Sequence, residues 1–248
     1  GFITPEDFQK IKVDIISGLR RKIERLVGRG ADKVIVPSKY LKKIVTMWGV
    51  TEENIKVVYN AFNAKEVVGS KEDLRKKFGF EKKVIFSAGR LVPWKGFEML
   101  IEIAKEFSDY ELLIAGDGPD RAKLENKIKE SNLNSRVTLV GSMEQGVLLE
   151  KIKASDVFIL NTGYEGLSHQ LLEVMSVGTP IVTTKIGGNQ EVIEDGKDGI
   201  LVDAVTDILT GSRKNIFTEN AKKKLSLFNK EKMIKETVKV LENTQTIK

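Results

Sequence analysis

The sequence is poor in the residues that carry thiol and metal chemistry. Its 248 residues include no cysteine and a single histidine. The missing cysteines exclude disulfides, thiol nucleophiles and thiolate metal sites, and one histidine excludes a metal centre built from several imidazoles. Only carboxylates remain as metal ligands, and we expect no metal.

Long apolar runs are also missing. No segment reaches the roughly 18 consecutive apolar residues that a membrane span requires. The first residues, GFITPEDFQK, lack the basic and then apolar layout of a signal peptide. We therefore expect a cytoplasmic protein. The composition, 41% hydrophobic and 31% charged residues, is typical of globular domains, of which this length allows one large or two small ones.

The positive charge is concentrated near the N-terminus. Residues 1–62 hold 12 Lys and Arg against 7 Asp and Glu, a net +5, whereas the other residues hold 29 against 28, a net +1. This favours the solvated face of an amphipathic helix, and the alternative is peripheral contact with an anionic membrane or partner. Nucleic acid is not expected, because no aromatic residues interleave with these charges to stack on bases.

From residue 84 onward, short apolar and β-branched runs alternate with helical stretches. About 20 residues separate the starts of successive runs, which is enough for a helical crossover between parallel strands. The sequence therefore predicts an α/β fold with a doubly wound, Rossmann-like parallel sheet. The predicted strands are VIFSAGR (84–90), ELLIAGDG (111–118), RVTLVG (136–141), DVFIL (156–160), PIVTT (180–184) and GILV (199–202).

The first 62 residues predict one βα unit of a different sheet. The expected order is a basic helix near 8–28, a strand at 33–38, a helix at 39–49 and a strand at 55–60. A single unit cannot bury its own apolar faces, so we expect self-association or a partner that supplies the rest of this domain. A Lys- and Glu-rich linker (64–83) ends in a short helix, and two C-terminal helices are expected with a break near Asn229.

Two glutamates in the stretch YEGLSHQLLEVMSVGTP indicate a ligand site. A helix is expected from Ser168 to Gly178, which places Glu165 in the preceding loop and Glu173 within the helix. Both carboxylates can then border one pocket. The backbone amides of Leu167, Ser168 and His169 point out of the helix N-terminus, where the helix dipole favours an anion such as phosphate.

A second cationic feature follows the first strand of the predicted sheet, in AGRLVPWKG. Gly89 allows a close approach of backbone and ligand, and Arg90 and Lys95 supply positive charge at the ligand edge of the sheet. Arginine binds phosphate oxygens in a planar bidentate way and lysine acts as a point charge, so the pair can hold a diphosphate without a metal. Gly116 ends the next strand, but GDGPDR is not a dinucleotide fingerprint, because Arg121 stands where its third glycine is needed.

These segments, taken in order, resemble the glycosyl transferases group 1 family, the retaining glycosyltransferases with the two-domain GT-B fold. The matching pieces include RLVPWKGFEMLIEIA, LLIAGDGP, YEGLSHQLLEVMSVGTPIV and GGNQEVIEDGKDGILV, and the Glu165-x7-Glu173 pair is the motif of that family. The resemblance implies a remnant of the N-terminal acceptor domain (1–62), a donor-binding Rossmann-like domain (63–228) and a C-terminal crossover helix (229–248).

The resemblance also implies roles for single residues. Arg90 and Lys95 would neutralise the diphosphate of a nucleotide-sugar such as a UDP-, GDP- or ADP-sugar. Glu173 would hold the ribose and Glu165 would border the donor sugar. The remaining implied contacts are the backbone from Gly166 to His169 against the distal phosphate, and the side chains of Met143 and Leu148 against the base. The leaving phosphate would take the proton of the acceptor.

Three functions follow from this pattern. The first is the donor-binding half of a retaining, metal-independent glycosyltransferase whose acceptor is an unknown sugar, lipid-linked molecule or protein. The second is a catalytically silent nucleotide-sugar-binding or scaffold subunit that needs a partner chain. The third is a GT-B epimerase or phosphorylase, which would share the fold. The intact Arg90, Lys95, Glu165 and Glu173 favour an enzyme.

Overall fold

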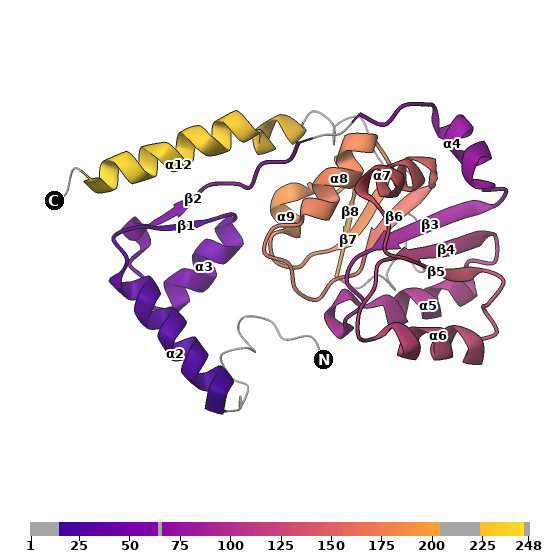
Figure 1. Cartoon of the computed structure of the whole chain (residues 1–248), viewed down its shortest axis with the longest axis horizontal. Helices are drawn as coiled ribbons and strands as arrows, with labels where there is room; N and C mark the ends of the chain where they lie inside the picture. The colour runs from indigo at the N-terminus through magenta and orange to yellow at the C-terminus, as the bar shows by residue number, and fades with distance from the viewer. Residues whose placement is uncertain (1–14, 64–65, 204–223, 246–248) are drawn as a thin grey trace.

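The protein is divided into two units in the computed structural model, which describes residues 15–63, 66–203 and 224–245. A six-stranded parallel sheet with the order β5-β4-β3-β6-β7-β8 forms the larger unit, and a two-stranded parallel sheet, β1-β2, belongs to the smaller N-terminal unit. Figure 1 shows the two units side by side, with the C-terminal helix running back from the larger unit towards the smaller one.

The six strands of the large sheet overlap the six predicted runs, which confirms the doubly wound α/β fold. They are β3 (Lys83–Ala88), β4 (Tyr110–Ala115), β5 (Val137–Gly141), β6 (Val157–Leu160), β7 (Ile181–Thr184) and β8 (Ile200–Val202). All five pairings between neighbouring strands are parallel.

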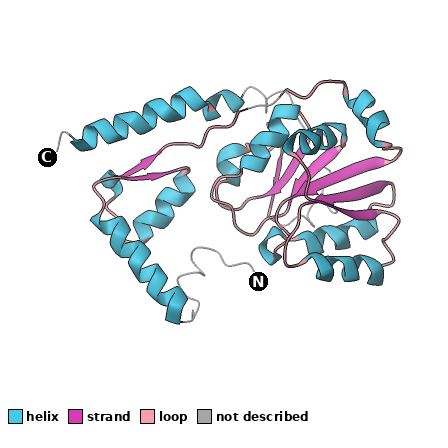
Figure 2. Ribbon diagram, in the orientation of Figure 1, coloured by secondary structure: helices cyan, strands magenta, loops and turns pink. Residues whose placement is uncertain are grey.

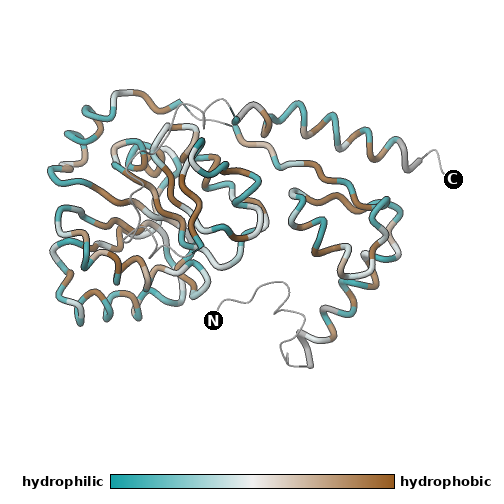
Figure 3. The backbone as a smooth tube through the Cα atoms, turned by 180° about the vertical axis from the view of Figure 1, so that it is seen from behind, coloured by the Kyte–Doolittle hydropathy of each residue, from teal (hydrophilic) through white to brown (hydrophobic). Residues whose placement is uncertain are grey.

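Helices cover both faces of the large sheet. Side chains alternate along β3, so that Val84 and Phe86 join one hydrophobic cluster and Ile85 joins another. The first cluster packs against α7 (Gln145–Ala154) and α8 (His169–Val177), and the second packs against α5 (Phe97–Glu106) and α6 (Arg121–Glu130). Figure 3 shows the hydrophobic colour gathered on the central strands and hydrophilic stretches along the outer helices.

The N-terminal unit has the order that the sequence predicts but a much smaller core. It contains α2 (Ile15–Gly30), β1 (Val34–Val36), α3 (Lys39–Met47), η1 (Glu52–Asn54) and β2 (Ile55–Val57). The start of the predicted basic helix, before residue 15, lies outside the described residues. The buried hydrophobic cluster of the N-terminal unit consists of Val36, Val45, Val50 and Ile55.

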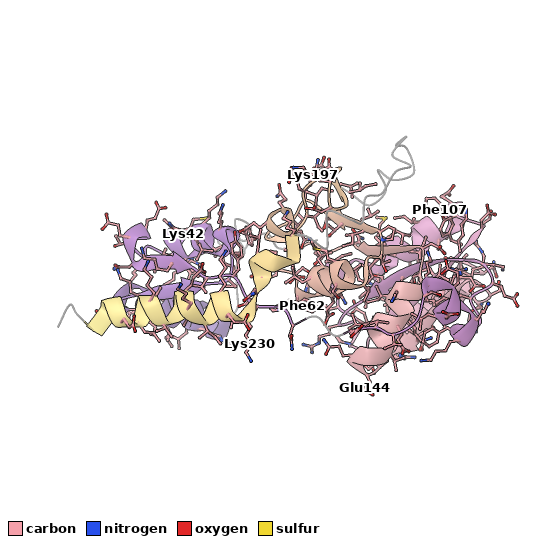
Figure 4. All side chains as sticks on the ribbon, turned by 90° about the horizontal axis from the view of Figure 1, so that it is seen from above. Lys42, Phe62, Phe107, Glu144, Lys197 and Lys230 are labelled. Carbon is pink, nitrogen blue, oxygen red and sulfur yellow. The ribbon has the colours of Figure 1, made fainter. Side chains whose placement is uncertain are left out.

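The remaining elements link the two units. The linker ends in α4 (Lys71–Phe78), as predicted, and the expected break at Asn229 separates η3 (Leu225–Phe228) from α12 (Lys230–Gln245). Most of the first predicted C-terminal helix lies outside the described residues. Backbone N–H of Phe62 donates to the carbonyl of Phe228 over 2.8 Å, which joins the strand-to-linker segment to the start of α12. Figures 2 and 4 show α12 as a long helix beside the N-terminal unit.

Candidate functional site

The strand order of the large sheet defines a ligand edge. β4 and β5 lie on one side of β3, whereas β6, β7 and β8 lie on the other, so the order reverses between β3 and β6. In open parallel sheets, ligands bind beyond the carboxyl ends of the strands at this reversal. The loops after β3 and β6 carry Lys95 and Glu165, respectively, which places both predicted residues at the switch point.

A pocket of about 290 Å³ opens at this edge. Five predicted residues line it: Gly89, Arg90, Gly116, Met143 and Leu148. Asp117, Ser142 and Gln170 also line it. Asp117 and Ser142 were not predicted, although they lie within two residues of strand ends, and Gln170, one helical turn before Glu173, was noted only as a departure from the family pattern. The pocket therefore collects residues from the loops after β3, β4 and β5 and from α7 and α8.

Gly89 and Gly116 are close to each other as well as to the pocket. Their φ angles are 144° and 127°, a region that other residues rarely adopt. A Cβ atom on Gly116 would lie 1.9 Å from the carbonyl oxygen of Gly89. The loops after β3 and β4 can therefore meet only if residue 116 is a glycine. This packing requirement adds to the close approach of a ligand, which the sequence suggested as the reason for these glycines.

Lys95 and Glu165 form an ion pair across the switch point. The ammonium of Lys95 donates to the carboxylate of Glu165 over 2.8 Å, and both side chains are largely shielded from solvent. Lys95 ends η2 (Pro93–Lys95), and Glu165 follows β6 by five residues. The pair therefore brings together two predicted site residues that are 70 positions apart in the sequence.

The turn that carries Lys95 is held by the segment after β6. The amide of Asn161 donates to the carbonyl of Gly96 over 2.9 Å, and backbone N–H of Gly163 donates to the carbonyl of Trp94 over 2.7 Å. The Thr162 hydroxyl donates to the carbonyl of Tyr164 over 2.8 Å and lies 3.3 Å from the carbonyl of Trp94. Asn161 and Thr162 stand where the resembling family usually has Pro-Ser, and the structure shows that they support the site through partners far away in the chain.

Helix α8 begins one residue after the predicted start. Ser168 is its N-cap, and the Ser168 hydroxyl accepts a hydrogen bond from the Leu171 amide over 3.3 Å. The side chain of Leu167 is buried in the hydrophobic core, whereas the imidazole of His169 lies 3.0 Å from the side-chain amide of Asn60 in the N-terminal unit. The predicted approach of a phosphate to the backbone here stays a prediction.

Glu173 lies in the middle of α8, one turn beyond the pocket-lining Gln170. Its carboxylate accepts a hydrogen bond of 2.8 Å from the amide of Gln145, the first residue of α7. Glu173 is partly exposed, so it retains access to a ligand. Gln145 is thus a further supporting residue, and the sequence did not indicate it.

The charges of the site differ in how they are compensated. Arg90 is exposed beside the pocket, and its guanidinium has no hydrogen bond or ion pair with the part of the chain that the structure describes. Partial burial, and then the negative charge of Glu165, raise the pKa of the Tyr164 phenol. No group of three or more His, Asp or Glu side chains with the spacing of a metal site occurs among the described residues.

The parallel sheet, its switch-point pocket and the smaller unit beside it define a GT-B-type α/β protein. Comparison with sequence families places the chain among glycosyltransferases: residues 70–226 match the model of "Glycosyl transferases group 1", and residues 4–66 match that of "Glycosyltransferase Family 4". Because the first match covers more than half of the chain, the chain belongs to the glycosyl transferases group 1 family.

One relative supports the family assignment, and two solved structures have a similar fold. The chain is 30% identical over 242 residues to an uncharacterized glycosyltransferase of Methanocaldococcus jannaschii, an alignment that covers 90% of this chain and 61% of the relative. Anabaena HepE, solved in complex with UDP-glucose, superposes with a TM-score of 0.80 at 22% identity, covering 99% of this chain and 70% of that one. Sucrose-phosphate synthase of Thermosynechococcus elongatus gives 0.81 at 22% identity, with coverages of 96% and 65%.

The chain is shorter than the proteins it resembles. It spans 61% of the archaeal relative, and the two structural similarities, both below 25% identity, concern the fold. Within the described residues, no helix combines the length and the apolar composition needed to cross a membrane.

Proposed function

We propose that this chain is the donor-binding half of a glycosyltransferase that transfers a sugar from a nucleotide-sugar with retention of anomeric configuration. The observation that carries the proposal is the switch-point arrangement. Arg90, which has no ion pair among the described residues, lies beside a 290 Å³ pocket, and the Lys95–Glu165 pair lies on the neighbouring loops. Family membership supports a transferase over a silent binding subunit.

The site supplies positive potential for a diphosphate from three sources. Arg90 contributes a guanidinium, Lys95 an ammonium and α8 the positive end of its helix dipole. Lys95 is paired with Glu165 over 2.8 Å, and a bound diphosphate would be a second anion within reach of the Lys95 ammonium. With this charge in place, we propose that binding does not require a divalent metal.

Catalysis would consist of positioning and electrostatic stabilisation of the leaving diphosphate. The bond between the anomeric carbon and the phosphate oxygen breaks, a bond to the acceptor oxygen forms, and the acceptor proton passes to the leaving phosphate. Glu165 would hold the sugar beside the breaking bond, and Glu173, oriented by Gln145, would accept hydrogen bonds from the ribose. No protein base is then needed in this half.

The donor is expected to be a UDP-sugar before a GDP- or ADP-sugar, because the similar Anabaena structure holds UDP-glucose. Calorimetric titration with UDP, GDP and ADP, each with and without EDTA, tests both parts of this proposal. We expect UDP to bind with the same affinity in both buffers. Complete loss of binding in EDTA would refute metal independence, and failure of all three nucleotides to bind would refute the donor site.

Two variants separate the roles of the glutamates. Glu173→Ala should weaken UDP and UDP-glucose to a similar extent, by about 1–3 kcal/mol for hydrogen bonds to a charged group. Glu165→Gln should leave UDP affinity nearly unchanged and lower turnover instead, because an interaction made mainly in the transition state affects kcat. Loss of UDP binding in Glu165→Gln but not in Glu173→Ala would reverse the assignment.

The second part of our proposal concerns what the N-terminal unit binds. Its helix α2 exposes four apolar side chains on one face, Leu19, Ile23, Leu26 and Val27, beside basic residues such as Arg25. We propose that this face packs against further polypeptide, either a second copy or a partner, that completes the acceptor domain. The same basic segment is the candidate for peripheral membrane contact, which sedimentation with anionic vesicles tests.

A further inference from the structure

A single carboxylate joins the N-terminal unit to the large sheet. Glu191, on the short helix α9 (Asn189–Val192), accepts hydrogen bonds from the backbone amides of Lys39 and Tyr40 over 2.9 and 2.8 Å. It also accepts a 2.8 Å hydrogen bond from the hydroxyl of Tyr59. All three donors belong to the N-terminal segment, more than 130 residues before Glu191. Both carboxylate oxygens are therefore used to bind the other unit.

Glu191 completes the N-terminus of α3. The first amides of a helix have no partner within it. Here Ser38 accepts from the Leu41 amide over 3.0 Å, and Glu191 accepts from the two preceding amides, so none of the three is left without an acceptor. A negative charge at this end also interacts favourably with the helix dipole. The contact is thus specific in geometry and in charge.

The same carboxylate is connected to the loop that carries Glu165. Gly187 and Gly188 precede α9, and the Gly188 amide donates to the carbonyl of Glu165 over 2.9 Å. A Cβ atom on Gly187 would lie 2.0 Å from the Glu165 carbonyl oxygen, and one on Gly188 would lie 2.1 Å from that of Gly166. The turn before α9 is therefore packed directly against the Glu165 loop.

Helix α3 touches that loop a second time. The rings of Tyr40 and Tyr164 make an edge contact with centroids 6.5 Å apart, and a Cβ atom on Gly166 would lie 2.9 Å from the Leu41 side chain. Movement of α3 away from Glu191 would thus remove packing from both ends of the Glu165 loop.

We infer that Glu191 is a positioning residue: by holding α3 against the turn before α9, it sets the placement of the Glu165 loop and of the N-terminal unit over the sugar side of the donor site. The inference deepens the proposed function and rests on it for its kinetic consequence, whereas its structural consequence can be measured without a donor.

The test compares Glu191→Gln with a control variant, Glu194→Gln, and with a milder variant, Tyr59→Phe, all made in the whole chain. In Glu191→Gln, one acceptor oxygen is replaced by an NH2 group that faces a donor. Glu194→Gln changes an exposed carboxylate three residues away, which forms an ion pair with the neighbouring Lys197. Tyr59→Phe removes one of the three hydrogen bonds and should give a smaller effect in the same direction.

Hydrogen–deuterium exchange gives the readout that needs no donor. In Glu191→Gln, we expect amides of peptides covering 39–41 and 164–168 to exchange about tenfold faster, as lost hydrogen bonds to a charged group allow. Peptides covering β3 and β4 should be unchanged, and Glu194→Gln should match the wild type. Unchanged exchange at 164–168 in Glu191→Gln would overturn the inference.

Kinetics then separate positioning from simple destabilisation. With UDP-glucose as probe and water as acceptor, we expect kcat for sugar release to fall about tenfold in Glu191→Gln while KM and UDP affinity stay within about twofold. Equal kcat in variant and wild type would overturn the kinetic part. If the wild type neither binds nor cleaves UDP-, GDP- or ADP-sugars, the proposed function fails, while the exchange result still decides whether Glu191 couples the units.

Discussion

The two units of the chain differ in how completely each buries its own apolar surface. The large sheet is covered on both faces, and Phe86 and Phe158 are fully buried with their rings 6.5 Å apart. In the N-terminal unit, four residues form the buried cluster, while Leu26 of α2 is 75% exposed. The large unit therefore has a core of its own that supports the site, whereas the smaller unit leaves much of its apolar surface exposed.

Helix α12 extends this contrast. Ile234, Val238 and Leu241 recur at helical spacing and are all exposed, although α12 runs beside the N-terminal unit. The exposed apolar faces on α2 and α12 are the basis for our proposal that this end of the molecule packs against further polypeptide.

Core truncations should show the largest difference between the units. We expect Phe158→Ala to lower the free energy of unfolding of the large unit by about 3–5 kcal/mol. Val45→Ala in the small cluster should cost about 1.5 kcal/mol. Urea unfolding, followed by Trp94 in the large unit and by Trp48 in the small one, measures both. Equal losses in the two variants would contradict the comparison.

An ion network should give the next largest effect. Asp156, just before β6, accepts hydrogen bonds from Lys71, Arg75 and the backbone amide of Val84, which fastens α4 to the sheet. We expect Asp156→Asn to cost about 2–4 kcal/mol, because it leaves two partly buried cations without their partner. The exposed Asp109→Asn is the matched control and should be nearly neutral.

The same carboxylate predicts a pH dependence. Burial alone would raise the pKa of Asp156, but hydrogen bonds from Lys71 and Val84 and the charges of Lys71 and Arg75 outweigh it and lower the pKa. The stabilisation is therefore present above the unfolded-state pKa of about 3.9 and is lost as the pH falls through the lower folded-state value. When the free energy of unfolding is measured from pH 6 to pH 2, the part of its pH dependence that Asp156 contributes should be absent from Asp156→Asn. An identical acid profile in the variant and the wild type would disprove it.

The smallest effect on stability, and the sharpest on association, is expected on α2. Leu26→Gln should change the free energy of unfolding by no more than about 0.5 kcal/mol, as is usual for exposed positions. It should nevertheless reduce self-association in sedimentation velocity, because it interrupts the exposed apolar face. Met99→Gln, an exposed apolar position on α5, is the control for the large unit. If the wild type and both variants all sediment as monomers at high concentration, the second-copy proposal is wrong.

Sequence reasoning was most successful where the signal is local. The six core strands, the start of α8 at its Ser168 cap, and the break at Asn229 follow from short-range periodicity and capping chemistry. Half of the pocket lining was also anticipated. Gly89, Arg90 and Gly116 were expected because glycines and charges that follow buried strands point to the ligand edge, whereas Met143 and Leu148 were implied by the family resemblance. The domain boundaries at residues 62 and 228, and the roles of the individual site residues, stay predictions.

Sequence reasoning missed the residues that act through partners far away in the chain. Gln145 was not expected in the site, Asn161 and Thr162 were noted without their partners, and Glu191 was not assigned any role. Each is an ordinary polar residue in its local context. The role of each residue becomes visible only when the fold brings a distant element beside it. For example, the side-chain amide of Gln145 lies 2.8 Å from the carboxylate of Glu173.

The amino-acid sequence by itself determined the order of strands and helices, the glycine turns at the ligand edge and the residue types available for chemistry, because these depend on interactions within a few positions. The tertiary structure alone decided that Lys95 pairs with Glu165 across 70 residues and that Glu191 caps a helix 152 positions earlier. Such pairs depend on which loops the sheet topology brings to one edge, and local periodicity carries no information about that placement.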